Sequence, residues 1–170
     1  MKFLLKSLLA ALCAEAGIED AAIVADIVET GSLALDGAEV IVDECDDGVH
    51  VSVAVLLGER SGQAAAPELL RYCLRHVFDT RHESLAPRFA IHGPGGDLAA
   101  VFRVEGAALE TGAAFLAVVE QLIELARDSF ADVCIAAAAE SFAMPGMTGP
   151  TPASAHAPGL APAGFISHKV

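Results

Sequence analysis

The segment Ser32–Leu57, SLALDGAEVIVDECDDGVHVSVAVLL, contains the clearest strand and turn signals in the chain. Asp36-Gly37 favours a two-residue hairpin, and Asp46-Asp47-Gly48 forms a second turn signal. After that turn, valine or leucine occupies every odd position from 49 to 57. Strict alternation is typical of a strand with one buried face. The segment therefore predicts a three-strand antiparallel meander whose third strand turns its odd-numbered side chains into the core.

The other face of this meander is more apolar than a face in contact with water usually is. Ile41, Ala54 and Leu56 are predicted to lie there, beside His50 and Ser52. This face would offer apolar surface to another protein chain. We therefore treat it as a candidate docking surface.

A second hairpin is predicted farther along, with strands at Phe89–His92 and Leu98–Val104 around a glycine-rich turn. Alternation divides each strand into two rows of side chains. The inward rows are predicted to hold Phe89, Ile91, Leu98, Ala100, Phe102 and Val104, and the outward rows Ala90, His92, Ala99, Val101 and Arg103. The outward rows are again unusually apolar.

Residues 2–16 predict an amphipathic helix. Its buried stripe is Leu5, Leu8, Leu9, Leu12 and Ala16. The opposite side carries Phe3, Ala10 and Ala14, which either form a bland outer face or let a second backbone approach closely. The same segment has features of a secretory signal peptide, but Lys6 and Ser7 interrupt its apolar run. We favour a retained helix, with the signal peptide as the alternative.

Two further segments have helical patterns, and the structure of a third is left open. Pro67–Asp79 predicts a helix with a core stripe of Leu70, Cys73, Leu74, Val77 and Phe78. A second strip on that helix, Leu69, Tyr72 and His76, is either a dimer contact or part of a broad buried face. A long helix is predicted from about residue 107 to about residue 140, either continuous or broken at Asp128-Ser129. Residues 18–31 fit a short helix or an extended lead equally well.

Composition limits the classes of partner. The 170 residues suit one domain, and the net charge of −13 opposes binding to nucleic acid or to anionic membranes, which attract clustered Lys and Arg. No apolar run is long enough to span a membrane. The last 28 residues include 15 Pro, Gly or Ala and no acidic residue. We therefore expect a domain at 1–142 and a disordered Pro/Ala/Gly-rich tail at 143–170.

Catalytic and metal-binding motifs are missing from the sequence. It contains no GxSxG elbow, P-loop, HExxH or dinucleotide fingerprint. The four widely spaced cysteines, Cys13, Cys45, Cys73 and Cys134, indicate free thiols rather than a metal site, with an isolated disulfide left open. Asp43, His50 and His92 are the strongest catalytic candidates, but a half-exposed structural histidine is more common than a catalytic one. We therefore expect a protein without enzymatic activity that binds neither a metal ion nor a cofactor.

The predicted α-β-β-β-α-β-β-α order resembles that of the class I type III secretion chaperones, the Tir-chaperone-like family, over roughly residues 1–140. The matching residues are Leu33-x-Leu35-Asp36-Gly37, Val53-x-Val55-Leu56-Leu57-Gly58, Leu69-Leu70 with Leu74, and the hairpin FAIHGPGGDLAAVFRV at 89–104. The resemblance implies an α+β fold: a twisted antiparallel sheet, made of the meander and the hairpin, packed with three helices.

The same resemblance implies a bacterial cytoplasmic homodimer without enzymatic activity. Its interface would include Leu69, Tyr72 and His76. Its partner would be the amino-terminal segment of a secreted effector, kept soluble and competent for secretion. The matching partner-binding positions are Phe3, Leu4, Ala10 and Ala14 on the first helix and Ile41, Leu56, Ala99 and Val101 on the sheet. The alternative is an exported or periplasmic interaction domain with residues 1–16 as a signal peptide.

Overall fold

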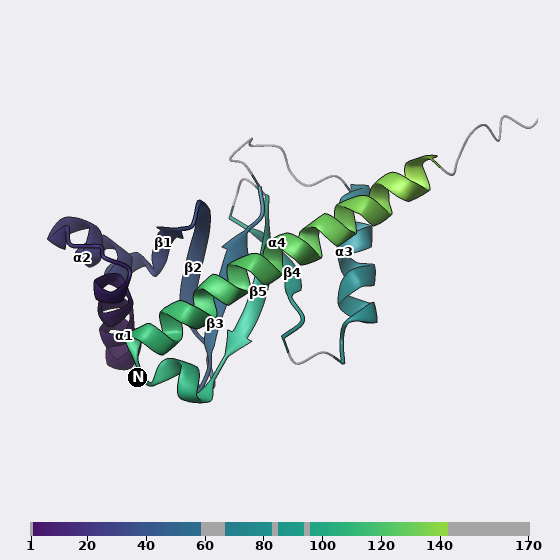
Figure 1. Cartoon of the computed structure of the whole chain (residues 1–170). Helices are drawn as coiled ribbons and strands as arrows, with labels where there is room; N and C mark the ends of the chain where they lie inside the picture. The colour runs from purple at the N-terminus through teal and green to yellow at the C-terminus, as the bar shows by residue number, and fades with distance from the viewer. Residues whose placement is uncertain (1, 59–66, 83–84, 94–95, 143–170) are drawn as a thin grey trace, which may run out of the picture.

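The computed structural model describes residues 2–58, 67–82, 85–93 and 96–142 (Figure 1). In chain order the elements are α1 (Lys2–Glu15), α2 (Ala21–Thr30), β1 (Ser32–Leu35), β2 (Ala38–Glu44), β3 (Val51–Leu56), α3 (Pro67–Asp79), β4 (Arg88–His92), β5 (Asp97–Val104), the 3-10 helix η1 (Gly106–Leu109) and α4 (Gly112–Phe142). The strands form one antiparallel sheet in the order β1-β2-β3-β5-β4. The predicted α+β class and element order are confirmed, with α2 added in the segment left open. The predicted tail at 143–170 lies outside the described residues.

The first hairpin depends on two residues with left-handed backbone. Asp36 has φ 50° and Gly37 has φ 73°. Two successive positive φ values are what a two-residue hairpin turn with the correct twist requires, and Asp-Gly supplies them with little strain. This turn pairs Leu35 with Ala38 and so places Val40 and Val42 on one face of β2. The register of the sheet therefore follows from a dipeptide that is visible in the sequence.

Helix α2 has a capping residue at each end. The Asp20 carboxylate accepts hydrogen bonds from the N–H groups of Ala22, at 2.8 Å, and Ile23, at 3.3 Å. At the other end Gly31, with φ 73°, donates its N–H to the carbonyl of Ile27. A Cβ on Gly31 would lie 2.3 Å from the carbonyl oxygen of Val42. Residues 18–31 thus contain a helix whose end is held directly against β2.

One face of the sheet packs against α1 and the first half of α4. The largest side chains of this core that are almost fully buried are Leu9, Leu12, Phe115, Leu122 and Ile123, together with Val40, Val42, Val53, Val55 and Val119. Helices α1 and α4 cross closely, because a Cβ on Gly112 would lie 2.6 Å from the carbonyl carbon of Ala11. The predicted stripe of α1 is confirmed at Leu8, Leu9 and Leu12.

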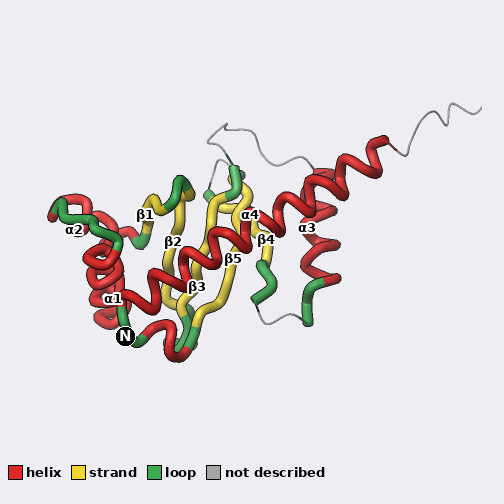
Figure 2. Tube along the Cα trace, viewed as in Figure 1, coloured by secondary structure: helices red, strands yellow, loops and turns green. Residues whose placement is uncertain are grey.

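A smaller core lies at the other end of the sheet, between α3 and the second half of α4. Its buried members are Tyr72, Cys73, Leu98 and Val133. Figure 2 shows α4 running across the whole sheet, from α1 at one end to α3 at the other. The helix continues through Asp128-Ser129 without a break, and it begins at Gly112 because residues 106–109 form η1. One helix therefore backs both cores.

The predicted faces of α3 are partly wrong. Leu74 and Phe78, expected in the core, are 68% and 63% exposed, whereas Tyr72, a predicted dimer contact, is only 7% exposed. The physical reason is that α3 is apolar around most of its circumference, while only the side bearing Tyr72 and Cys73 packs against the smaller core. Tyr72 therefore has little surface left for a second chain. The low exposure of Tyr72 favours the alternative of a broad buried face at this residue.

Two corrections concern the second hairpin. Ile91, predicted to point inward, is exposed, because β4 is the edge strand of the sheet. Ala99, predicted as an outward partner contact, is only 1% exposed, and it lies between Leu56 and Ala90 on the neighbouring strands. Its short side chain is hidden by its neighbours, so Ala99 offers almost no surface to a partner.

Candidate functional site

The second face of the sheet, which we call the outer face, carries a row of side chains that crosses all five strands. Strand register places Ser32 opposite Ile41, Ile41 opposite Ala54, Ala54 opposite Val101, and Val101 opposite Arg88. Ile41, Ala54 and Val101 are neither buried nor fully exposed. Leu56, in the next row, has the same intermediate burial. The inner face is covered by α4 and α1, whereas this row keeps apolar surface exposed.

The partner-binding residues predicted on α1 lie elsewhere. Leu4, Ala10 and Ala14 are exposed, and the Phe3 side chain lies outside the described residues. Leu4 lines a small apolar notch of about 30 Å³ with Val49, from the turn between β2 and β3. The structure therefore brings Leu4 to this turn, whereas Ile41, Leu56 and Val101 belong to the outer face.

A charged cluster lies at one end of β3 and β5. The His50 ring has its Nδ1 2.8 Å from the Asp47 carboxylate, and its Nε2 contacts the carboxylate of Glu105. Arg103 donates a hydrogen bond to the same Asp47 carboxylate. The backbone N–H of Val49, with that of His50 and the His50 ring, holds the pKa of Asp47 at about 2. The cluster combines the Arg103–Asp47 ion pair with the contacts of the His50 ring, and it fixes the β2–β3 turn against the end of β5.

The three catalytic candidates from the sequence are not brought together. His50 precedes Val51, which pairs with Val104, whereas His92 pairs with Asp97 at the far end of β5. Seven residues of extended strand separate these positions by about 23 Å. Asp43 lies opposite Ser52, and the carboxylates that reach His50 are those of Asp47 and Glu105. Strand alternation predicts which face of the sheet a residue lies on, but it does not predict the position of that residue along the strand.

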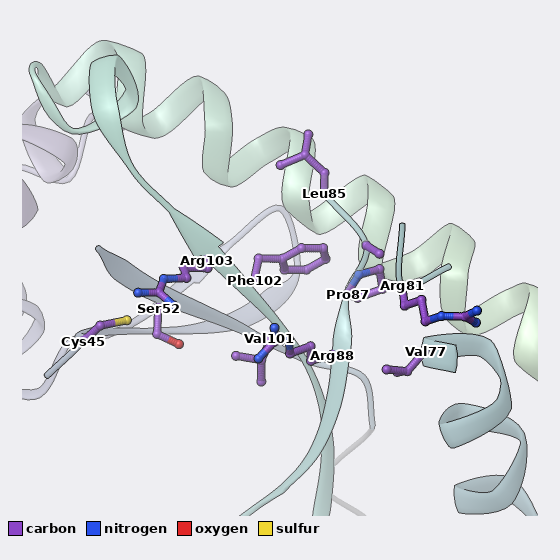
Figure 3. A pocket seen from close by; sticks show the side chains of 11 residues that line it. Cys45, Ser52, Val77, Arg81, Leu85, Pro87, Arg88, Val101, Phe102 and Arg103 are labelled. Carbon is purple, nitrogen blue, oxygen red and sulfur yellow. The ribbon is translucent and has the colours of Figure 1, made fainter. Parts of the chain in front are cut away.

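A pocket of about 600 Å³ lies where β4 begins (Figure 3). One wall consists of Cys45, Ser52 and the three consecutive β5 residues Val101–Arg103. The other wall comes from the end of α3 and the connection to β4: Val77, Arg81, Leu85, Ala86, Pro87 and Arg88. These residues come from four separate segments, so no local sequence pattern reveals the pocket.

No cluster of three or more His, Cys, Asp or Glu side chains suited to a metal ion occurs within the described residues. All four cysteines are free thiols there. Burial, with a smaller contribution from the nearby Cys134, raises the pKa of the Cys73 thiol to about 11. Cys73 is therefore a protonated core residue at neutral pH.

No protein-family model matches the chain, and no curated protein matches it. In the described part of the chain, none of the helices combines the length and the apolarity that a membrane span needs.

Proposed function

We propose that this chain is a non-enzymatic, homodimeric chaperone of the class I type III secretion kind, which binds the amino-terminal segment of a secreted effector in the bacterial cytoplasm. The observation that carries the proposal is the uncovered apolar row Ile41–Ala54–Val101 on the outer face. A protein that holds an unfolded segment needs apolar surface that it does not bury itself. The α+β element order supports the same proposal.

Burial of α1 favours this proposal over an exported domain with residues 1–16 as a signal peptide. Leu9, Leu12 and Cys13 are almost fully buried against the sheet and α4. Cleavage after residue 16 would remove all three and leave an unfilled core, which costs several kcal/mol for even one large aliphatic side chain. The burial of these side chains therefore supports a retained α1.

Exposed side chains on α3 support the homodimer. Leu74 and Phe78 on α3 are large apolar residues that are more than half exposed. Ile91, on the edge strand β4 at the same end of the sheet, is about half exposed. Isolated exposed apolar side chains are ordinary, but two on one face of a short helix beside a free strand edge favour an interface. We therefore assign the dimer contact to Leu74 and Phe78 in place of Tyr72. Leu69 and His76 pack toward the smaller core.

The proposal is tested by co-expression with each protein encoded beside this chain, followed by size-exclusion chromatography with light scattering. We expect a stable complex with one of them. Ala54→Glu, which places a charge in the middle of the apolar row, should weaken this complex at least tenfold. Ala25→Glu adds the same charge at an exposed position of α2 and serves as the control. Failure of every neighbour to bind, or equal effects of the two variants, would contradict the proposal.

A further inference from the structure

The pocket at the start of β4 has an unusual charge for this protein. The chain has a net charge of −13 and only ten Lys and Arg residues, yet Arg81, Arg88 and Arg103 all line this one pocket. None of the described residues that line it is acidic. Figure 3 shows the three arginines on different sides of the space, with Arg88 close to Val101. The pocket is therefore a cationic region on an acidic molecule.

The three arginines differ in what they already bind. Arg103 is held by Asp47 and lies 2.8 Å from the His50 ring. Arg81 donates to the carbonyl of Phe78 at 2.5 Å and lies over the Phe78 ring, 4.0 Å from its centroid. The Arg88 backbone pairs with Val101, but for its guanidinium no hydrogen bond or ion pair occurs within the described residues. Arg88 thus has a charge that is free to meet a ligand, and the other two arginines are fixed beside it.

The pocket also contains an open strand edge. Strand β4 pairs with β5 only from Arg88, opposite Val101, to His92, whereas β5 continues to Val104. Pro87 precedes β4, and proline has no N–H with which to extend the pairing. Phe102 and Arg103 therefore line the pocket with one side of their backbone paired to β3 and the other side unpaired by β4. An extended peptide can pair with such an edge.

We propose that this pocket binds an extended acidic peptide segment, with backbone hydrogen bonds to β5 and a carboxylate on Arg88. Val77, Leu85 and Val101 supply apolar surface for the neighbouring side chains of the segment. Arginine binds a carboxylate through two parallel hydrogen bonds, so the contact selects Asp or Glu over their amides. The acidic body does not prevent this contact, because charges more than about 8 Å away are largely screened at physiological ionic strength.

This inference rests on the proposed function in one respect: Arg88 ends the outer-face row Ile41–Ala54–Val101, so the acidic segment would continue from a chain lying across that row. It adds a chemical requirement to the partner. The apolar row can bind a partner through apolar side chains alone. The pocket requires that the partner also has a carboxylate next to them.

The test uses a fluorescein-labelled peptide in which valine alternates with aspartate, and the same peptide with asparagine, measured by fluorescence anisotropy with the full chain. We expect the acidic peptide to bind about tenfold more tightly. Arg88→Gln should reduce its affinity to that of the amide peptide, and Arg88→Lys should restore only part of the loss. Arg75→Gln removes a charge of the same sign from the exposed side of α3 and should change neither affinity.

Two further measurements test the binding mode. An acidic peptide with N-methyl groups on alternate residues should lose most of its affinity, because it cannot complete the hydrogen bonds of an added strand. Inorganic phosphate should compete only weakly, since it lacks both the backbone and the apolar side chains. Competition by phosphate as effective as that by the peptide would mean a small-anion pocket and would overturn the inference.

Other outcomes separate the inference from the proposed function. Equal affinity for the acidic and amide peptides, no binding of either, or no effect of Arg88→Gln would each overturn the inference. A natural partner whose binding is weakened by Ala54→Glu but not by Arg88→Gln would overturn it while leaving the chaperone proposal standing. Acidic-peptide binding that depends on Arg88 in a chain that binds no neighbouring gene product would support the pocket and count against the chaperone.

Discussion

The two ends of the sheet are built with different tightness. At the end formed by α1 and α2, two glycines sit where a single added methyl group would meet backbone atoms, Gly31 against Val42 and Gly112 against Ala11. At the end formed by α3 and β4, Leu74 and Phe78 are largely exposed. Exposed apolar side chains occur at both ends, with Leu4 and Ile23 at the first, so the difference lies in the close backbone contacts of the first end, which we call the closed end, against the exposed pair Leu74 and Phe78 on one face of α3 at the second, which we call the loose end. The difference separates residues needed for folding from residues free to bind.

The largest expected effect is a difference in the free energy of unfolding between the same Leu→Ala truncation in α1 and in α3. Leu12→Ala in α1 should lower the free energy of unfolding by about 2–5 kcal/mol, because it leaves a cavity in the core. Leu74→Ala in α3 should change it by no more than about 0.5 kcal/mol. Denaturant unfolding of both variants, each made in a Phe78→Asp background to exclude subunit contact, measures the difference. Similar losses for the two would remove the contrast between the ends.

A second substitution tests the close crossing of α1 and α4. Gly112→Ala should destabilise the protein by about 1–3 kcal/mol, because the new Cβ would lie 2.6 Å from the carbonyl carbon of Ala11 and force the helices apart. Gly58→Ala is the control, since a Cβ there meets nothing within 4 Å. Thermal unfolding of the two variants gives the comparison. A neutral Gly112→Ala would mean that this end is less tightly packed than described.

A substitution at the end formed by α3 and β4 should change the oligomeric state and leave the stability of the subunit unchanged. Phe78→Asp places a charge on the exposed side of α3 and should convert the proposed dimer to a monomer without lowering the unfolding midpoint of that monomer. Ile23→Asp introduces the same charge at an exposed position of α2, at the closed end, and should leave the dimer intact. Light scattering measures both. A dimer that survives Phe78→Asp would place the interface elsewhere.

The smallest effect is a pH dependence at the β2–β3 turn. Because the folded protein holds the pKa of Asp47 at about 2, below its ordinary value, the ionised carboxylate contributes stability above that ordinary value. The contribution is lost as pH falls through about 2. The stability difference between the wild type and Asp47→Asn should therefore be constant above about pH 5 and shrink toward pH 2. Denaturant unfolding at several pH values measures it, and a difference that grows on acidification would contradict the assignment.

Sequence patterns predicted the sheet better than they predicted the helices. Asp36-Gly37 and the alternating valines determine the meander, because a turn with two positive φ values and a period of two leave a single register. Helix α3 has apolar residues on most of its circumference, so periodicity alone did not identify its buried side. That choice depends on which side meets α4, and α4 lies far along the chain. Asp20 and Gly31, by contrast, are capping signals that would have settled α2.

The candidate site shows the same limit. The outer-face row at Ile41, Ala54 and Val101 follows from strand parity and was predicted in part, whereas Ala99 was assigned to the surface although its neighbours cover it. The arginine pocket was not predicted at all. Its charged residues come from the turn after α3, from the start of β4 and from β5, and only the tertiary fold brings them together.

Helix α4 has a consequence for how the molecule unfolds. Its 31 residues, about 46 Å of helix, pack Phe115 and Ile123 into the larger core and Val133 into the smaller one. Neither core can lose its contacts without releasing part of the same continuous hydrogen-bonded rod. The two ends of the sheet are therefore joined by a single element, and we expect them to unfold as one cooperative unit.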